Sequence, residues 1–149
     1  MLVRLFIVVL SLAGLADALY FTLAYYGRIR KARWVPEILC AREGSNCVTV
    51  VRTPYARVFG VPNSLLGIVY YVLLLAWIMF VPRHASIAGH VLRPFEILGL
   101  LLLGAGLSSV VFGFYLIYAL RRILYTHCPL CYVAHAINTV LFVLLIFVS

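Results

Sequence analysis

The sequence predicts an all-α integral membrane protein, a bundle of four transmembrane helices with a long capping loop between the first and second helices. The chain is 66% hydrophobic and only 11% charged, which leaves too little polar surface to cover a soluble domain of 149 residues. Four apolar stretches are also long enough to cross a ~30 Å hydrocarbon layer at about 1.5 Å of rise per residue. We expect one membrane domain over 1–149.

The first apolar stretch, 5–26, begins like a signal peptide, because Arg4 precedes a hydrophobic run. The run is longer than a signal core of about 15 residues, and it ends in Tyr25, Tyr26 and a basic segment, as a stop-transfer sequence does. We therefore take it as the first membrane helix. Its single acid, Asp17, either relays protons or bonds a neighbouring helix.

The polar segment 27–63 follows, with several prolines and glycines among mixed charges. It is too long to be an idle connection in a compact bundle, so we expect a functional cap that contains short helical pieces. The remaining helices are predicted at 64–81, 97–120 and 128–148, with a plain linker at 82–96. Several glycines in 97–120 predict close approach of neighbouring backbones.

The net charge of +8 would suggest nucleic acid in a soluble protein. Here the basic residues flank membrane helices, so they indicate topology and lipid contact, and we expect no nucleic-acid partner. Both termini and the linker 82–96 hold three basic residues, whereas the other side holds nine: Arg28, Arg30, Lys31, Arg33, Arg42, Arg52, Arg57, Arg121 and Arg122. The positive-inside rule therefore puts the long loop in the cytoplasm.

The four cysteines form two pairs, Cys40 with Cys47 in the long loop and Cys128 with Cys131 at the start of the last helix. In Cys128-Pro-Leu-Cys131 the sulfurs lie three residues apart, on one helical face and close enough for a disulfide. A helix N-terminus and the arginines at 121–122 stabilise a thiolate, the nucleophile of disulfide exchange. Reactivity should concentrate at this pair.

Three other interpretations of the cysteines remain: a zinc site, inert structural disulfides in a scaffold or small transporter, and buried apolar residues. The spacing of Cys40 and Cys47 is looser than a usual zinc knuckle, and the second pair lies at the mouth of a membrane helix. Covalent c-type haem would need a histidine directly after Cys131, where Tyr132 stands.

His135 lies one turn beyond Cys131 and two turns beyond Cys128, on the same helical face. A histidine inside a membrane is a functional hypothesis by default, although a neighbouring helix can also satisfy it. A membrane-soluble electron acceptor with carbonyl oxygens, held beside the cysteine pair, would explain this arrangement.

Over nearly its whole length the chain resembles the vitamin K epoxide reductase family, in its single-domain prokaryotic form without a fused thioredoxin domain. The similarity lies in the segment Cys40–Cys47, in the segment Phe59–Gly67 and in Cys128-Pro-Leu-Cys131 through Asn138, in this order. The bacterial disulfide-bond membrane oxidases place their Cys-x-x-Cys pair early and their spaced pair late, which is the opposite order.

The resemblance implies a quinone-dependent thiol oxidoreductase that makes disulfides. A thioredoxin-like partner with a reduced Cys-x-x-Cys would meet Cys40, Cys47 would exchange with Cys128, and Cys131 would lie nearest a membrane quinone, which is menaquinone, ubiquinone or a vitamin K-like molecule. The alternative is a quinone or quinone-epoxide reductase whose relevant product is the reduced quinone. Most relatives work toward an oxidising compartment, so an extracytoplasmic loop is the alternative orientation.

The resemblance also implies a quinone pocket. Asn63 would bond one quinone carbonyl, and Tyr55, Phe59 and Tyr71 would line the pocket. His135 stands where vertebrate-like members carry a tyrosine donor. An imidazole can donate a hydrogen bond as a phenol can, but its charge depends on pH, so quinone preference can differ from that of the tyrosine form.

Overall fold

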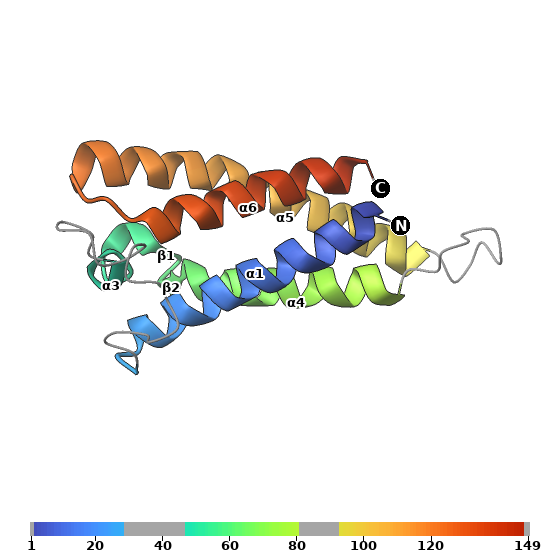
Figure 1. The fold of residues 1–149 in the computed structure, drawn as a ribbon, viewed down its shortest axis with the longest axis horizontal. Helices are drawn as coiled ribbons and strands as arrows, with labels where there is room; N and C mark the ends of the chain where they lie inside the picture. The colour runs from blue at the N-terminus through green and yellow to red at the C-terminus, as the bar shows by residue number, and fades with distance from the viewer. Residues whose placement is uncertain (1, 29–46, 81–92, 148–149) are drawn as a thin grey trace.

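Four long helices form the body of the molecule (Figure 1). The computed structural model describes residues 2–28, 47–80 and 93–147. The long helices are α1 (Leu2–Tyr25), α4 (Asn63–Phe80), α5 (Arg93–Tyr118) and α6 (Pro129–Ile146). All four are long and apolar enough to cross a membrane, which confirms the predicted fold class.

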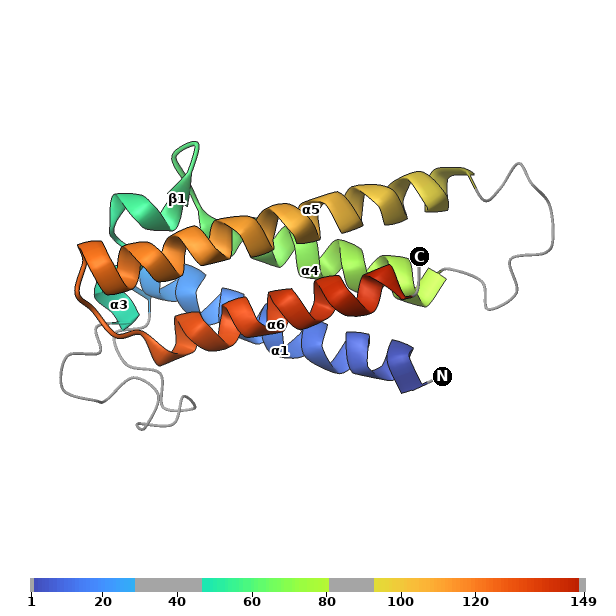
Figure 2. The ribbon, with the colours of Figure 1, turned by 90° about the horizontal axis from the view of Figure 1, so that it is seen from above.

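The helices close into a bundle because each packs against two others. Helix α1 contacts α4 and α6, and α5 contacts the same two helices. Both chain ends lie at one end of the bundle, and the connection from α5 to α6 lies at the opposite end together with the short elements of the polar segment (Figures 1 and 2). All cysteines that the structure describes therefore lie at this second end, called the cysteine end below.

The helix ends differ from the expected bounds by one to four residues, and the largest difference is at the start of α5. Helix α5 begins at Arg93 rather than at 97, because Pro94 fits the first turn of a helix, where its missing N–H needs no partner. Beyond Tyr118 the same helix widens into a π-helical turn, Ala119–Ile123, whose Leu124 N–H donates to the Ala119 carbonyl at 2.9 Å. This turn leads the chain toward α6.

The described part of the polar segment contains short helical pieces, as expected, and also a small hairpin. Helix α3 (Cys47–Val50) is followed by a 3₁₀ turn (Pro54–Ala56) and by strands β1 (Arg57–Val58) and β2 (Val61–Pro62), which pair antiparallel. Phe59 and Gly60 join the strands with φ of 52° and 83°. A two-residue hairpin loop with both φ positive is a type I′ turn.

The buried side chains fall into two clusters. The cluster at the cysteine end joins α1, the polar segment and α6 through Tyr20, Phe21, Ala24, Val51, Leu120, Cys128 and Leu130. The second cluster fills the bundle further along, with Ile7, Ala18, Tyr71, Leu74, Trp77, Ile78, Leu102, Leu141 and Leu145. Apolar side chains such as Leu12, Leu101 and Phe114 point outward, where lipid surrounds a membrane helix.

Glycines of α5 make room for ring side chains of the neighbouring helices. Three of them recur every seven residues, and a Cβ added at each would lie 2.8–3.1 Å from a ring or hydroxyl atom of a neighbouring helix. The pairs are Gly99 with Trp77, Gly106 with Tyr70, and Gly113 with His135.

Candidate active site

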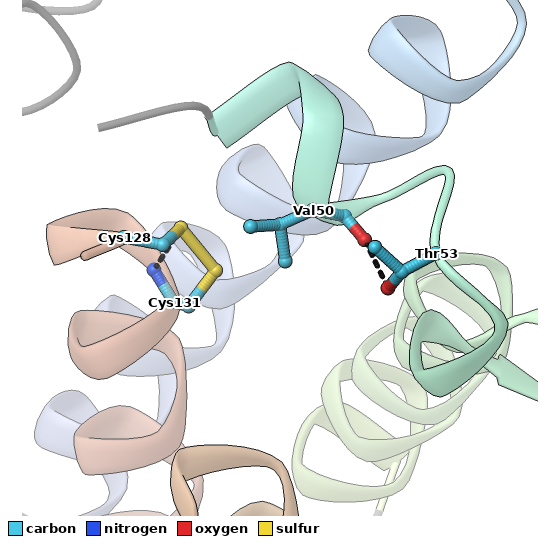
Figure 3. The surroundings of a disulfide bond; sticks show 4 residues. All are labelled: Val50, Thr53, Cys128 and Cys131. Atoms are coloured by element: carbon cyan, nitrogen blue, oxygen red, sulfur yellow. Dashed lines mark hydrogen bonds between the residues drawn. A yellow bond between two sulfur atoms is a disulfide. The ribbon is translucent and has the colours of Figure 1, made fainter. Parts of the chain in front are cut away.

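A disulfide joins Cys128 and Cys131 at the first turn of α6 (Figure 3), as the three-residue spacing predicted. Cys128 is the N-cap residue, and its sulfur accepts a hydrogen bond from the Cys131 N–H at 3.3 Å. Pro129 occupies the first helical position, where its fixed φ favours helix initiation. The sulfur of Cys128 thus lies at the positive end of the helix dipole, which favours a thiolate when the disulfide opens.

A positive side chain also lies beside this turn. The Arg121 guanidinium is 5.7 Å from the centre of the Tyr132 ring, and Tyr132 directly follows Cys131. The cation–π contact holds the charge near the first turn of α6, where it adds to the helix dipole. The π-helical turn that carries Arg121 therefore serves the electrostatics of the cysteine pair.

The two cysteines face different surroundings. Cys128 is fully buried against Phe21, Val51 and Leu120, whereas Cys131 is partly buried. Figure 3 shows the Val50 side chain directed toward the disulfide from α3. Just beyond the end of α3, the Thr53 hydroxyl donates a hydrogen bond to the Val50 carbonyl at 2.7 Å.

Cys47 is the first residue of α3, three residues before Val50. Helix α3 contacts both α1 and α6 at the cysteine end. At about 1.5 Å of rise per residue the Cys47 backbone therefore lies about 5 Å along the helix from the residue that faces the disulfide. Cys40, the other predicted loop cysteine, lies outside the described residues.

A cavity of about 820 Å³ lies beside the disulfide, between the four long helices and the polar segment. Its walls are mainly apolar, with a few polar groups among them. Five predicted site residues line it: Tyr55, Asn63, Tyr71, Cys131 and His135. The fold thus gathers residues that are distant in the sequence around one space, as ligand sites in membrane bundles require.

Phe59 is the predicted pocket residue that the structure places elsewhere. It is not among the cavity-lining residues, and its side chain is fully exposed, at 102% of the reference area. The type I′ turn explains this position, because it turns the chain back at Phe59 and Gly60 and directs the turn away from the bundle.

Tyr71 and Asn138 connect α4 to α6 across the cavity. The Tyr71 hydroxyl donates to Asn138 Oδ1 at 2.6 Å, and the Tyr71 ring lies against Gly14 of α1. Tyr71 is only 3% exposed. Asn138 was not among the predicted site residues, although a polar residue seven positions beyond Cys131 lies on the same helical face and was detectable from that spacing.

His135 lies between Cys131 and Asn138 on the cavity face of α6. Its Nδ1 is buried and has no hydrogen-bond partner among the described residues. The ring packs against Gly113 of α5, where a Cβ would come within 2.8 Å of Nδ1. Within residues 2–28, 47–80 and 93–147 no cluster of three or more His, Cys, Asp or Glu side chains could hold a metal ion.

Four membrane helices around a disulfide that borders an apolar cavity define a multi-pass membrane oxidoreductase. A sequence profile of the vitamin K epoxide reductase family matches residues 5–146, so the chain belongs to this family. The family links redox and disulfide chemistry to quinone or vitamin K-type substrates. A search of curated proteins found no significant match.

Proposed function

We propose that the protein is a quinone-dependent thiol oxidoreductase that makes disulfides. In this proposal electrons pass from a thioredoxin-like partner through Cys40 and Cys47 to Cys128 and Cys131, and on to a membrane quinone. The observation that carries the proposal is the double role of Cys131, which belongs to the disulfide and also lines the cavity. One sulfur pair thus borders both the polar segment and the space for an acceptor.

On the donor side, a reduced Cys-x-x-Cys of the partner attacks a Cys40–Cys47 disulfide, and the freed Cys47 thiolate attacks the sulfur of Cys128. Each attack forms one S–S bond and breaks another. The second thiol of the partner then displaces Cys40, and the Cys40 thiolate displaces Cys128 from Cys47, so the partner leaves with a disulfide, the Cys40–Cys47 bond is restored, and Cys128 and Cys131 are both reduced. The placement of α3 against the first turn of α6 supports this order. Cys128 is fully buried, so α3 must shift away from it for the exchange.

On the acceptor side, breaking the Cys128–Cys131 bond releases Cys131 as a thiolate at the cavity wall. A bound quinone supplies an acceptor for two electrons and two protons. The apolar walls suit a quinone ring and the start of an isoprenoid tail, and Tyr55 and Tyr71 contribute to them. The Asn63 amide and the His135 imidazole act as hydrogen-bond donors to the quinone oxygens, where negative charge develops.

The test is quinone reduction by the purified protein in detergent, with a reduced thioredoxin-like substrate and a soluble quinone analogue. The intact chain should consume one quinone for each disulfide formed in the substrate, and Cys131→Ala should consume none. Val133→Ala is the matched control, because Val133 is exposed on the same helix and does not line the cavity. Absence of quinone reduction with any dithiol donor would refute the proposal.

We also propose that the cysteine end faces the cytoplasm. The basic side chains Arg28, Arg52, Arg57, Arg121 and Arg122 belong to segments at this end, whereas Arg4 starts α1 at the other end. Such an excess marks the cytoplasmic side. A membrane-impermeant thiol reagent should then label the reduced loop cysteines in inverted vesicles. Labelling in right-side-out vesicles alone would establish the extracytoplasmic alternative.

A further inference from the structure

Helices α1 and α6 form two adjoining walls of the cavity with the same residue spacing. Both helices line it at positions i, i+3, i+4 and i+7, the pattern of a single helical face. The α1 residues are Gly14, Asp17, Ala18 and Phe21, and the α6 residues are Cys131, Ala134, His135 and Asn138. The two helices run antiparallel and pack against each other (Figures 1 and 2).

Two contacts fix the relative height of these walls. At the cysteine end, Phe21 belongs to the buried cluster against which Cys131 packs. Deeper in the bundle, Tyr71 lies against Gly14 and bonds Asn138. The two levels are separated by seven residues on each helix, or about 10 Å.

Asp17 and His135 therefore lie at the same depth on adjoining walls. Asp17 is one turn from Phe21, and His135 is one turn from Cys131, which puts both about 6 Å below the disulfide level. An acid and an imidazole thus border the space proposed for the quinone ring at one level, each from its own helix.

Among the described residues, Asp17 is the acidic residue that lines the cavity. Its Oδ1 is buried and has no hydrogen-bond partner in the part of the chain that the structure describes. An unpaired carboxylate inside a membrane is costly, so the group is retained as the neutral acid, which can donate a proton. An acid inside a membrane is a functional hypothesis by default, and proton relays are one such function.

We propose that Asp17 is a catalytic proton carrier for quinone reduction, an inference that rests on the proposed function. In each turnover the thiols of Cys128 and Cys131 lose two electrons and two protons and form one S–S bond, and the quinone gains the same two electrons and two protons. The Asp17 carboxyl gives its proton to a quinone oxygen and recovers one of the protons released by the thiols. Its own protonation state is therefore unchanged after the cycle.

The test compares Asp17→Asn with the wild type and with Asp17→Glu. The amide keeps the size and hydrogen-bonding capacity of the acid but cannot donate a proton as an acid does. Asp17→Asn should lower kcat for quinone reduction at least about 100-fold, the lower bound of general acid catalysis, with KM unchanged. Asp17→Glu should restore part of the rate. Reduction of the Cys128–Cys131 bond by a small dithiol, followed by thiol labelling without quinone, should be unaffected.

A second measurement does not depend on activity. Infrared difference spectra of quinone binding should show a perturbed carbonyl band of a protonated carboxyl in the wild type, and this band should vanish in Asp17→Asn. The chain has only four acidic residues, so the band is readily assigned. Ser11→Ala is the control, because Ser11 also carries a buried, unpartnered polar atom on α1 but does not line the cavity.

The outcomes separate the two proposals. A wild-type protein that reduces quinone together with an Asp17→Asn variant of unchanged kcat would overturn the role of Asp17 and leave the proposed function standing. The same holds if the carboxyl band is absent from the wild type, or if Ser11→Ala slows the reaction as much as Asp17→Asn does. A wild-type protein that reduces no quinone would overturn both.

Discussion

The contact between Gly113 and His135 should make the proposed quinone site sensitive to a single methyl group on α5. In Gly113→Ala the new Cβ would lie 2.8 Å from Nδ1 and 3.2 Å from Cγ of the imidazole, well inside the ~3.5–4.0 Å of an ordinary contact. Such overpacking costs about 1–3 kcal/mol. The higher helix propensity of alanine relative to glycine stabilises the folded state by about 1 kcal/mol. The free energy of unfolding should therefore change by about 0–2 kcal/mol in the destabilising direction.

Quinone affinity should change more clearly than stability. The methyl group forces the imidazole to move, which would remove its proposed hydrogen bond to the quinone at a cost of about 0.5–1.5 kcal/mol. This cost corresponds to an increase of about 2- to 10-fold in the Kd for a quinone analogue. The assay is an equilibrium titration of the analogue in detergent, beside thermal unfolding of each variant.

Gly104→Ala is the matched control. Gly104 lies on the same helix, and a methyl group added there meets no atom within 4 Å. It should gain about 1 kcal/mol of stability without a change in Kd. In a His135→Ala background the further change Gly113→Ala should leave Kd unaltered, because the clash is gone. The reasoning is refuted if Gly113→Ala behaves as Gly104→Ala does, with higher stability and the same Kd.

Three further substitutions test the fold around the site. Tyr71→Phe removes the hydrogen bond to Asn138, and thermal or denaturant unfolding should show a loss of about 1 kcal/mol; an unchanged midpoint would contradict the bond. Gly14→Ala places a methyl group inside the Tyr71 ring, and should lower the free energy of unfolding by about 1–3 kcal/mol, whereas Gly104→Ala should not. Phe59 is exposed and has a positive φ, which glycine adopts without strain. Phe59→Gly should therefore raise the free energy of unfolding by about 1 kcal/mol and leave quinone affinity unchanged. Weaker quinone binding would instead place Phe59 at the pocket.

The membrane helices were predictable because hydrocarbon imposes a length and an apolar composition on any helix that crosses it. Their exact ends were not, because they depend on local features such as Pro94 in the first turn of α5 and the π-helical turn after Tyr118. The disulfide at the start of α6 followed from local geometry alone, since a three-residue spacing at a helix start leaves few other positions for two sulfurs.

The walls of the cavity were only partly predictable. His135 could be placed from its spacing to Cys131 on one helix. The partners of Tyr71 and His135 come from other helices, and the Tyr71–Asn138 bond joins residues 67 positions apart. Such contacts depend on how helices pack, which no local pattern reports. Phe59 illustrates the same limit, because a two-residue turn decided its direction.

The asymmetry of the cysteine pair gives the proposed electron path its direction. Cys128 is sealed in the cluster that includes Val51 of the polar segment, and Cys131 borders the cavity. A thiolate can attack only a sulfur that it reaches, so in the proposed path a nucleophile from the polar segment attacks Cys128 once α3 has shifted, and the sulfur that leaves is Cys131. The leaving thiolate then forms at the cavity wall, one turn above the level of Asp17 and His135. The same helix start that favours the thiolate therefore also delivers it to the side where an acceptor and a proton carrier can lie.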